Sequence, residues 1–333
     1  MMKNKDILYS IQNLSVEYPT RSGLLRAVDQ VSFEINRGEV LGLVGESGCG
    51  KSTLGKALMR MIQPPGQIPS GELWFENRNL LKITQEEMRQ LRGNRISMIF
   101  QDPMTSLNPV QRVVDHLIET IQTHDDLLST EAARDRASQL IDRLGIRNER
   151  LDDYPHQLSG GMRQRVMISL ALALRSDLII ADEATTSLDV IVEAQFLDLL
   201  RALREEFYLT ILLITHNIGV VAEVSDRVAV MYAGKIVELR PVHQLFKEPL
   251  HPYTEGLLKS VPNIKLVGDD LYKMGGVPPN LISPPSGCRF HARCPKALDI
   301  CSQVSPTFQD IGDNQFTACW LYEDIPEKYR SVD

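Results

Sequence analysis

The chain has 333 residues, 43% hydrophobic and 24% charged, which is typical of a globular protein large enough for more than one domain. Its formal net charge of −7 offers no general basic surface for phosphate backbones, which argues against a nucleic-acid partner. Neither a secretory signal nor an apolar run of membrane-spanning length is found, so we expect a cytosolic chain in a compartment where disulfides are rare.

The first third of the chain predicts mostly strands. Alternating apolar runs indicate hairpin strands within 7–18 and 31–35, with 19–28 as the loop between them. A buried strand is expected at 39–45, followed by a helix at 51–62 that ends at a Pro/Gly-rich stretch. Further strands are predicted at 72–80 and 96–101.

The remainder predicts an α/β arrangement. Residues 104–174 have a mostly helical pattern. Apolar runs at 178–183 and 209–216 are typical of buried parallel strands, and the helix at 195–207 would be their crossover. A closing hairpin is expected at 226–239, and a Pro/Gly-rich connector at 275–287 leads into a cysteine-bearing segment.

A phosphate loop is the first candidate site. The segment GESGCGKST lies between the buried strand and the helix. Its glycines let backbone N–H groups surround a phosphate, Lys51 supplies a positive charge, and Ser52 can bind magnesium. The predicted nucleotide-binding residues of this loop are Gly45, Ser47, Gly48, Cys49, Gly50, Lys51, Ser52 and Thr53.

Two adjacent acids end the strand at 178–183. Asp182 and Glu183 stand at its carboxyl end, where open α/β sheets bind ligands. One carboxylate can hold magnesium while its neighbour orients or deprotonates the attacking water. Such acids are often only solvated, but a phosphate loop earlier in the chain favours the catalytic interpretation.

With these motifs stands LSGGMRQRV at 158–166, which resembles the signature sequence of ATP-binding cassette (ABC) ATPases. The resemblance covers residues 7 to about 240 and implies a P-loop NTPase fold with a parallel-sheet core, an antiparallel β subdomain and a helical subdomain. It makes Gln101 the Q-loop residue and a magnesium ligand with Ser52 and Asp182, Glu183 the catalytic base and His216 the switch histidine. Ser187, Leu188 and Asp189 match the D-loop, and Tyr18 matches an adenine-stacking aromatic. Ala184 departs from the family, in which proline is usual there.

The signature also implies an assembly. Ser159, Gly160 and Gly161 precede a helical run, so they would present a hydroxyl and N–H groups at a helix N-terminus, an anion site. In the family this site binds the γ-phosphate held by a partner cassette, so ATP joins two subunits. Since the chain has one phosphate loop and one signature, the second cassette must come from another chain or a second copy.

Three segments resemble one branch of that family. QDPMTSLNP at 101–109, HQLSGGMRQR at 156–165 and HPYTEGLL at 251–258 are similar to the ATPases of oligopeptide and dipeptide importers and their nickel-uptake relatives. The resemblance divides the chain into a cassette at 1–240, with its helical subdomain at about 104–174, and an extension at 241–333. It implies two permease subunits and, indirectly, an extracytoplasmic solute-binding protein as partners, with the chain at the cytoplasmic membrane face. Peptides are the expected solute, with nickel or another solute as the alternative. A non-transport ABC ATPase is the less favoured alternative.

Four of the five cysteines lie near the C-terminus. Cys288, Cys294, Cys301 and Cys319 have wider gaps than most structural zinc sites, so spacing alone leaves metal ligands and free buried thiols both open. The resemblance implies a 4Fe–4S cluster on these four residues, with zinc as the alternative. Ala292 replaces a proline often found in that segment. We expect His291 to be a structural neighbour of the cysteines, with a role as ligand as the alternative.

Overall fold

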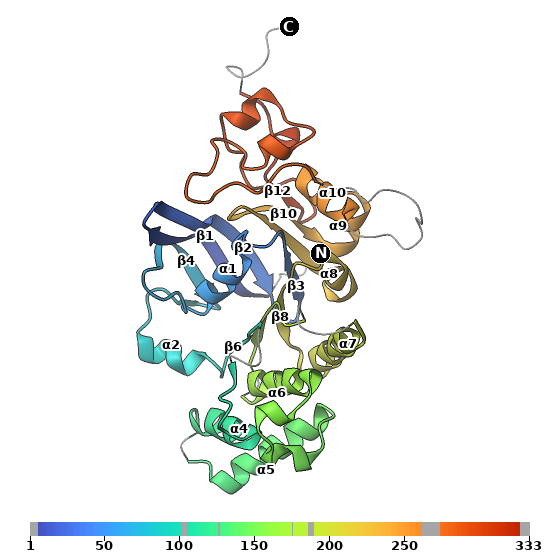
Figure 1. The fold of residues 1–333 in the computed structure, drawn as a ribbon. Helices are drawn as coiled ribbons and strands as arrows, with labels where there is room; N and C mark the ends of the chain where they lie inside the picture. Colours follow the sequence, from blue (N-terminus) through green and yellow to red (C-terminus); the bar gives the residue numbers. More distant parts are fainter. Residues whose placement is uncertain are drawn as a thin grey trace. The chain divides into compact units, whose positions relative to one another are not determined.

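The computed structural model describes residues 6–101, 106–125, 127–174, 176–185, 190–260 and 274–326. The chain divides into two compact units, and Figure 1 labels their main helices and strands. Unit 1 comprises Met1–Asp6, Ile35–Val40 and Lys82–Thr215, and unit 2 comprises Ile7–Glu34, Leu41–Leu81 and His216–Asp333. No helix among the described residues is long and apolar enough to cross a bilayer.

Unit 1 contains three parallel strands. Strand β7 (Leu178–Asp182) pairs with β6 (Ile96–Ile99) on one side and with β8 (Thr210–Ile214) on the other. Every residue of the three is buried, which explains their unbroken apolar runs. Helix α7 (Val190–Phe207) lies between β7 and β8 in the sequence, so the predicted strand, helix and strand are confirmed.

Helices form the rest of unit 1, as the pattern of 104–174 predicts. Helices α4, α5 and α6 contact one another and form the green group in Figure 1. In α4 the buried residues Val113, Val114, Leu117 and Ile121 recur every three or four positions, so one face is apolar. The helices and 3₁₀ turns are α2 (Gln85–Leu91), α4 (Val113–Gln122), α5 (Thr130–Arg143), η1 (Asn148–Asp152), η2 (Pro155–Gln157) and α6 (Gly160–Leu172).

Unit 2 begins with an antiparallel sheet in the strand order β2-β1-β4-β5. Its strands are β1 (Ile7–Thr20), β2 (Gly23–Asn36), β4 (Gln67–Phe75) and β5 (Arg78–Asn79). The predicted loop at 19–28 is wrong, because only residues 21–22 separate β1 from β2. Ala27 and Val28 are buried in the sheet. Strand β2 therefore continues through the segment for which the turn residues predicted a loop.

A second group of strands in unit 2 has the order β11-β12-β10-β9-β3. Strand β3 (Val40–Val44) runs parallel to β9 (Arg227–Tyr232), and β10 (Lys235–Pro241) runs antiparallel to β9, which confirms the closing hairpin. The short strands β11 (Gln309–Asp310) and β12 (Phe316–Thr317) join it through β10. The C-terminal segment is therefore hydrogen-bonded directly to the hairpin.

The helices of unit 2 are short. They are α1 (Lys51–Leu58), α8 (Ile218–Val224), α9 (Val242–Lys247) and α10 (Pro252–Lys259), with 3₁₀ turns η3 (His291–Arg293), η4 (Asp299–Ser302) and η5 (Trp320–Tyr322). Helix α1 ends four residues before the predicted 51–62 does.

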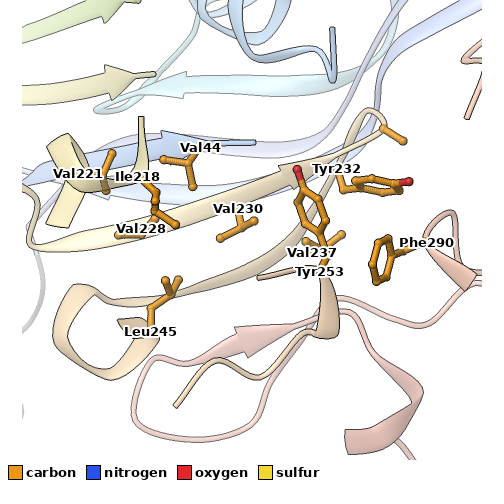
Figure 2. Packing of buried hydrophobic residues seen from close by; sticks show 11 residues of the cluster. Val44, Ile218, Val221, Val228, Val230, Tyr232, Val237, Leu245, Tyr253 and Phe290 are labelled. Carbon is orange, nitrogen blue, oxygen red and sulfur yellow. The ribbon is translucent and has the colours of Figure 1, made fainter. Parts of the chain in front are cut away.

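One apolar cluster ties the late segments of unit 2 to its strands (Figure 2). Tyr232 of β9 lies with its ring centroid 4.5 Å from that of Tyr253 on α10 and 5.2 Å from that of Phe290. All three side chains are buried. Packing of aromatic rings at such distances adds to the stabilisation from burial, so residues after 241 share a core with the strands before it.

Candidate functional site: a phosphate loop and its neighbours

The phosphate loop of unit 2 joins β3 to α1, as predicted. Gly45, Gly48 and Gly50 all have positive φ, of 157°, 76° and 109°. A Cβ on Gly50 would lie 2.1 Å from the carbonyl oxygen of Ala27, and one on Gly45 would lie 2.1 Å from that of Met231. These two positions therefore require glycine for space as well as for conformation.

Lys51 begins helix α1 and is buried, with 3% of its surface exposed. Its Nζ donates hydrogen bonds to the carbonyl oxygens of Gly45, at 2.8 Å, and Glu46, at 3.1 Å. The ammonium group thus lies inside the loop, where a point charge can meet phosphate oxygens. Burial raises the pKa of the neighbouring Cys49 thiol, which fits a small filler better than a reactive group.

Glu46 is a residue of this loop that the sequence did not single out. Its backbone N–H donates to the hydroxyl of Tyr253 at 2.9 Å. Its carboxylate accepts two hydrogen bonds from Arg293, each of 2.8 Å. The partners lie 207 and 247 positions further along the chain, so no local pattern could have revealed them.

Two other predicted residues of unit 2 have defined places. Tyr18 lies on β1, partly buried, and its ring lies so close to Gly66 that a Cβ there would approach it to 2.4 Å. His216 is exposed and stands two residues before helix α8, whose N-cap is Asn217. Their roles toward adenine and γ-phosphate stay predictions.

Unit 1 contains the two acidic residues predicted at the end of β7, Asp182 and Glu183. Asp182 ends β7 and is 4% exposed. Glu183 has a positive φ of 47°, uncommon for a residue with a side chain, and its N–H donates to the carbonyl oxygen of Ile214 at 2.8 Å. Gln101 Nε2 donates to Glu183 Oε2 at 3.2 Å, so the structure brings together the two residues predicted as Q-loop and catalytic base.

Ala184, the departure from the family pattern, is buried beside Glu183. Its carbonyl oxygen accepts a hydrogen bond from Nε2 of Gln164, a buried residue of α6. Helix α6 thereby contacts the segment that carries Glu183, the predicted catalytic base. Asp189, together with Ser187 and Leu188, lies outside the described residues.

The signature segment has the predicted local form. Ser159 is the N-cap of α6, and its side-chain oxygen accepts a hydrogen bond from the backbone N–H of Met162 at 3.3 Å. Ser159 and Gly160 are exposed, and a Cβ on Gly160 would meet nothing within 4 Å. This helix N-terminus is therefore open to an incoming anion.

The C-terminal cysteines Cys288, Cys294, Cys301 and Cys319 form no disulfide with one another. Burial, reinforced by the other thiols nearby, raises the pKa of Cys288 to about 12 and that of Cys319 to about 11. His291 is a structural neighbour of these cysteines, since its Nδ1 is 2.8 Å from the carbonyl oxygen of Cys288. Within the described ranges, no three His, Cys, Asp or Glu side chains are grouped so that they could hold a metal ion, so neither the iron–sulfur nor the zinc prediction gains support.

Comparisons with known proteins agree with the motifs. Residues 28–186 match the family model described as ABC transporter, and residues 237–301 match that of the oligopeptide/dipeptide transporter C-terminal region. The chain is 46% identical over 321 residues to the dipeptide transport ATP-binding protein DppD of Bacillus subtilis, covering 96% of each chain. It is 43% identical over 316 residues to the oligopeptide transport ATP-binding protein OppD of Escherichia coli, covering 95% of this chain and 93% of the relative.

Solved structures support the fold class. The ATP-binding cassette MJ0796, described as a dimer in a post-hydrolysis state with ADP and Pi, has a TM-score of 0.64 and 26% identity. The alignment covers 70% of this chain and 98% of that one. The predicted fold class, a P-loop NTPase cassette with parallel strands, an antiparallel sheet and a helical part, is confirmed. The chain therefore belongs to the ABC transporter family of ATPases, in the branch of the oligopeptide and dipeptide transport ATP-binding proteins.

Proposed function

We propose that this chain binds and hydrolyses ATP to power an ABC importer of dipeptides or oligopeptides. The observation that carries the proposal is the match at 43–46% identity to peptide transport ATP-binding proteins over nearly the whole chain, together with a phosphate loop built around buried Lys51. The alternative of nickel as the solute has no observation in its favour.

Within that function, Lys51 and the loop N–H groups bind the phosphates, and Glu183 accepts a proton from the attacking water. Gln101, which donates to Glu183, orients that carboxylate. Ser52, Asp182 and Gln101 offer the oxygen donors that Mg²⁺ prefers, and the ion would neutralise phosphate charge when bound. His216 would contact the γ-phosphate, and Tyr18 would stack on adenine.

The assembly is a pair of cassettes on two permease subunits at the cytoplasmic membrane face, supplied by an extracytoplasmic solute-binding protein. Ser159, Gly160 and Gly161 at the open N-terminus of α6 would bind the γ-phosphate held by the partner cassette, with Asp189 at the same interface. In this proposal residues 1–240 form the cassette, with 104–174 as its helical subdomain, and residues 241–333 form the extension.

We further propose that Cys288, Cys294, Cys301 and Cys319 bind a 4Fe–4S cluster. Contacts between the segments support this: the N–H of Cys288 donates to the carbonyl oxygen of Cys301 at 2.7 Å, and Cys288 packs against the apolar cluster that contains Cys301. A cluster distributes its four thiolates over separate irons, so they need not converge on one point as zinc ligands must. Iron and sulfide analysis of protein purified without oxygen tests it: about four of each per chain are expected, and zinc or no metal would refute it.

The main test is uptake. A strain lacking this gene should lose uptake of a labelled dipeptide, regain it with the wild-type gene and fail to regain it with Glu183→Gln. Uptake of radioactive nickel in the same strains is the control. Unchanged peptide uptake with lost nickel uptake would overturn the proposed solute, and a purified chain that does not bind MgATP would overturn the motor role.

A further inference from the structure

Two segments of the C-terminal extension meet at one residue of the phosphate loop. Tyr253 belongs to the HPYT segment that begins α10, and Arg293 immediately precedes Cys294. Both contact Glu46, which stands between Gly45 and Ser47. All these residues belong to unit 2.

Glu46 is held at each of its polar groups. Tyr253 accepts from its N–H at 2.9 Å, Lys51 donates to its carbonyl oxygen at 3.1 Å, and Arg293 binds both carboxylate oxygens. A bidentate pair between guanidinium and carboxylate sets orientation as well as distance. The loop itself supplies Lys51 and the N–H of Cys49, which donates to the carbonyl oxygen of Glu46 at 3.3 Å, and the extension supplies the other two partners, Tyr253 and Arg293.

Arg293 is itself firmly placed. Its side chain is 5% exposed, and its Nε donates to the carbonyl oxygen of Gly275 at 2.9 Å. Its guanidinium lies 5.7 Å from the ring centroid of Tyr232 and 5.9 Å from that of Phe290. Because two aromatic rings and a carbonyl oxygen contact the guanidinium, Arg293 can hold Glu46 in one position.

The loop needs outside support. Three of its residues are glycines with positive φ, so its backbone has little side-chain packing of its own to restrict it. An unpaired carboxylate at Glu46 would also repel a polyphosphate bound by the same loop. Arg293 removes both problems, since it orients Glu46 and neutralises its charge.

We infer that Arg293 is a positioning residue for the phosphate loop, through which the C-terminal extension sets the affinity of the site for the phosphates of ATP. The inference rests on the proposed ATP-binding function. It gives the extension a part in the nucleotide site that the phosphate-loop motif does not include.

The test is equilibrium binding of MgATP to the purified full chain. Arg293→Met keeps an unbranched apolar stem and removes the charge, and should lower the affinity roughly tenfold or more. Arg293→Lys keeps the charge without the bidentate geometry and should fall between. Because the two residues act as a pair, adding Glu46→Gln to Arg293→Met should cause no further loss of affinity, a coupling that general damage to the extension would not produce.

Arg289→Met is the matched control. Arg289 lies in the same segment with a side chain 7% exposed, and it pairs with Asp29 and the carbonyl oxygen of Ala233 without touching the loop. This variant should lower the melting temperature and leave MgATP affinity unchanged.

The outcomes separate the two proposals. A wild-type chain that fails to bind MgATP refutes the proposed function. A wild-type chain that binds, with Arg293→Met binding equally well or with Glu46→Gln lowering the affinity further in the Arg293→Met background, refutes the positioning role alone. If Arg293→Met does not fold, the same comparison uses Arg293→Lys, whose loss of affinity should not increase when Glu46→Gln is added.

Discussion

Glu238 on β10 is fully buried and accepts a hydrogen bond of 2.9 Å from the backbone N–H of His251, the N-cap of α10. Its other carboxylate oxygen accepts one from the N–H of Leu250, also at 2.9 Å. Arg240 lies 3.6 Å away. A strand carboxylate thus anchors the start of the helix that carries Tyr253 to the phosphate loop.

We expect Glu238→Leu to destabilise the fold by about 2–4 kcal/mol, because it leaves two backbone N–H groups without their acceptor and removes the carboxylate that faces Arg240. Glu238→Gln keeps one oxygen acceptor and should cost about half as much. Urea unfolding measures both, with the exposed Glu205→Gln as a control that should stay within about 0.5 kcal/mol of wild type. Equal stability of wild type and Glu238→Leu would contradict the anchoring role.

His251 predicts a dependence of stability on pH. Burial lowers its pKa from 6.5 to about 3, so the folded protein keeps the imidazole neutral while the unfolded chain takes up a proton. The stability it contributes is complete above about pH 6.5 and is lost as the pH falls from there toward 3, by about 1.4 kcal/mol at pH 5.5.

His251→Asn is the variant that isolates this effect. Its amide oxygen can replace Nδ1, which accepts from the N–H of Tyr253 at 3.0 Å, and asparagine is a favoured N-cap. Unfolding free energies at pH 7.5 and 5.5 should show a smaller acid loss in the variant, with other titrating groups common to both proteins. The same loss in both would place the acid sensitivity elsewhere.

Glu183→Gln should bind MgATP with near wild-type affinity and hydrolyse it roughly 10²–10⁴-fold more slowly, because the amide cannot accept the proton of the attacking water. The amide retains a partner for Gln101 and the size of the side chain. Binding and phosphate release should be measured on the same preparation of the complete complex. Near-normal turnover would remove Glu183 from the catalytic role.

The glycines of the phosphate loop should differ in their tolerance of alanine. Gly50→Ala places a Cβ against the carbonyl oxygen of Ala27, so it combines a clash with backbone strain. Gly48→Ala has open space around its Cβ and carries the strain alone, about 1–2 kcal/mol. Thermal unfolding should rank Gly50→Ala as the less stable; the reverse order would mean that the loop relaxes around Ala27.

Local sequence patterns predicted those strands and helices whose type is set by residues close to them in the sequence. The apolar runs of β3, β7 and β8 were recognisable because strands buried on both faces need no polar side chains. The hairpin loop was misplaced, since burial of Ala27 and Val28 depends on what the sheet packs against. Turn residues alone could not show where β2 begins.

By itself the sequence determined the phosphate loop, the signature helix and the order of the motifs, because each depends on glycine conformations, capping residues and apolar spacing within a few positions. Only the tertiary structure decided that Gln101 meets Glu183 and that Tyr253 and Arg293 hold Glu46. The physical reason is distance along the chain. Glu46 and Arg293 are 247 positions apart, so no local pattern links them. Packing of the strands and of the aromatic cluster brings their charges together.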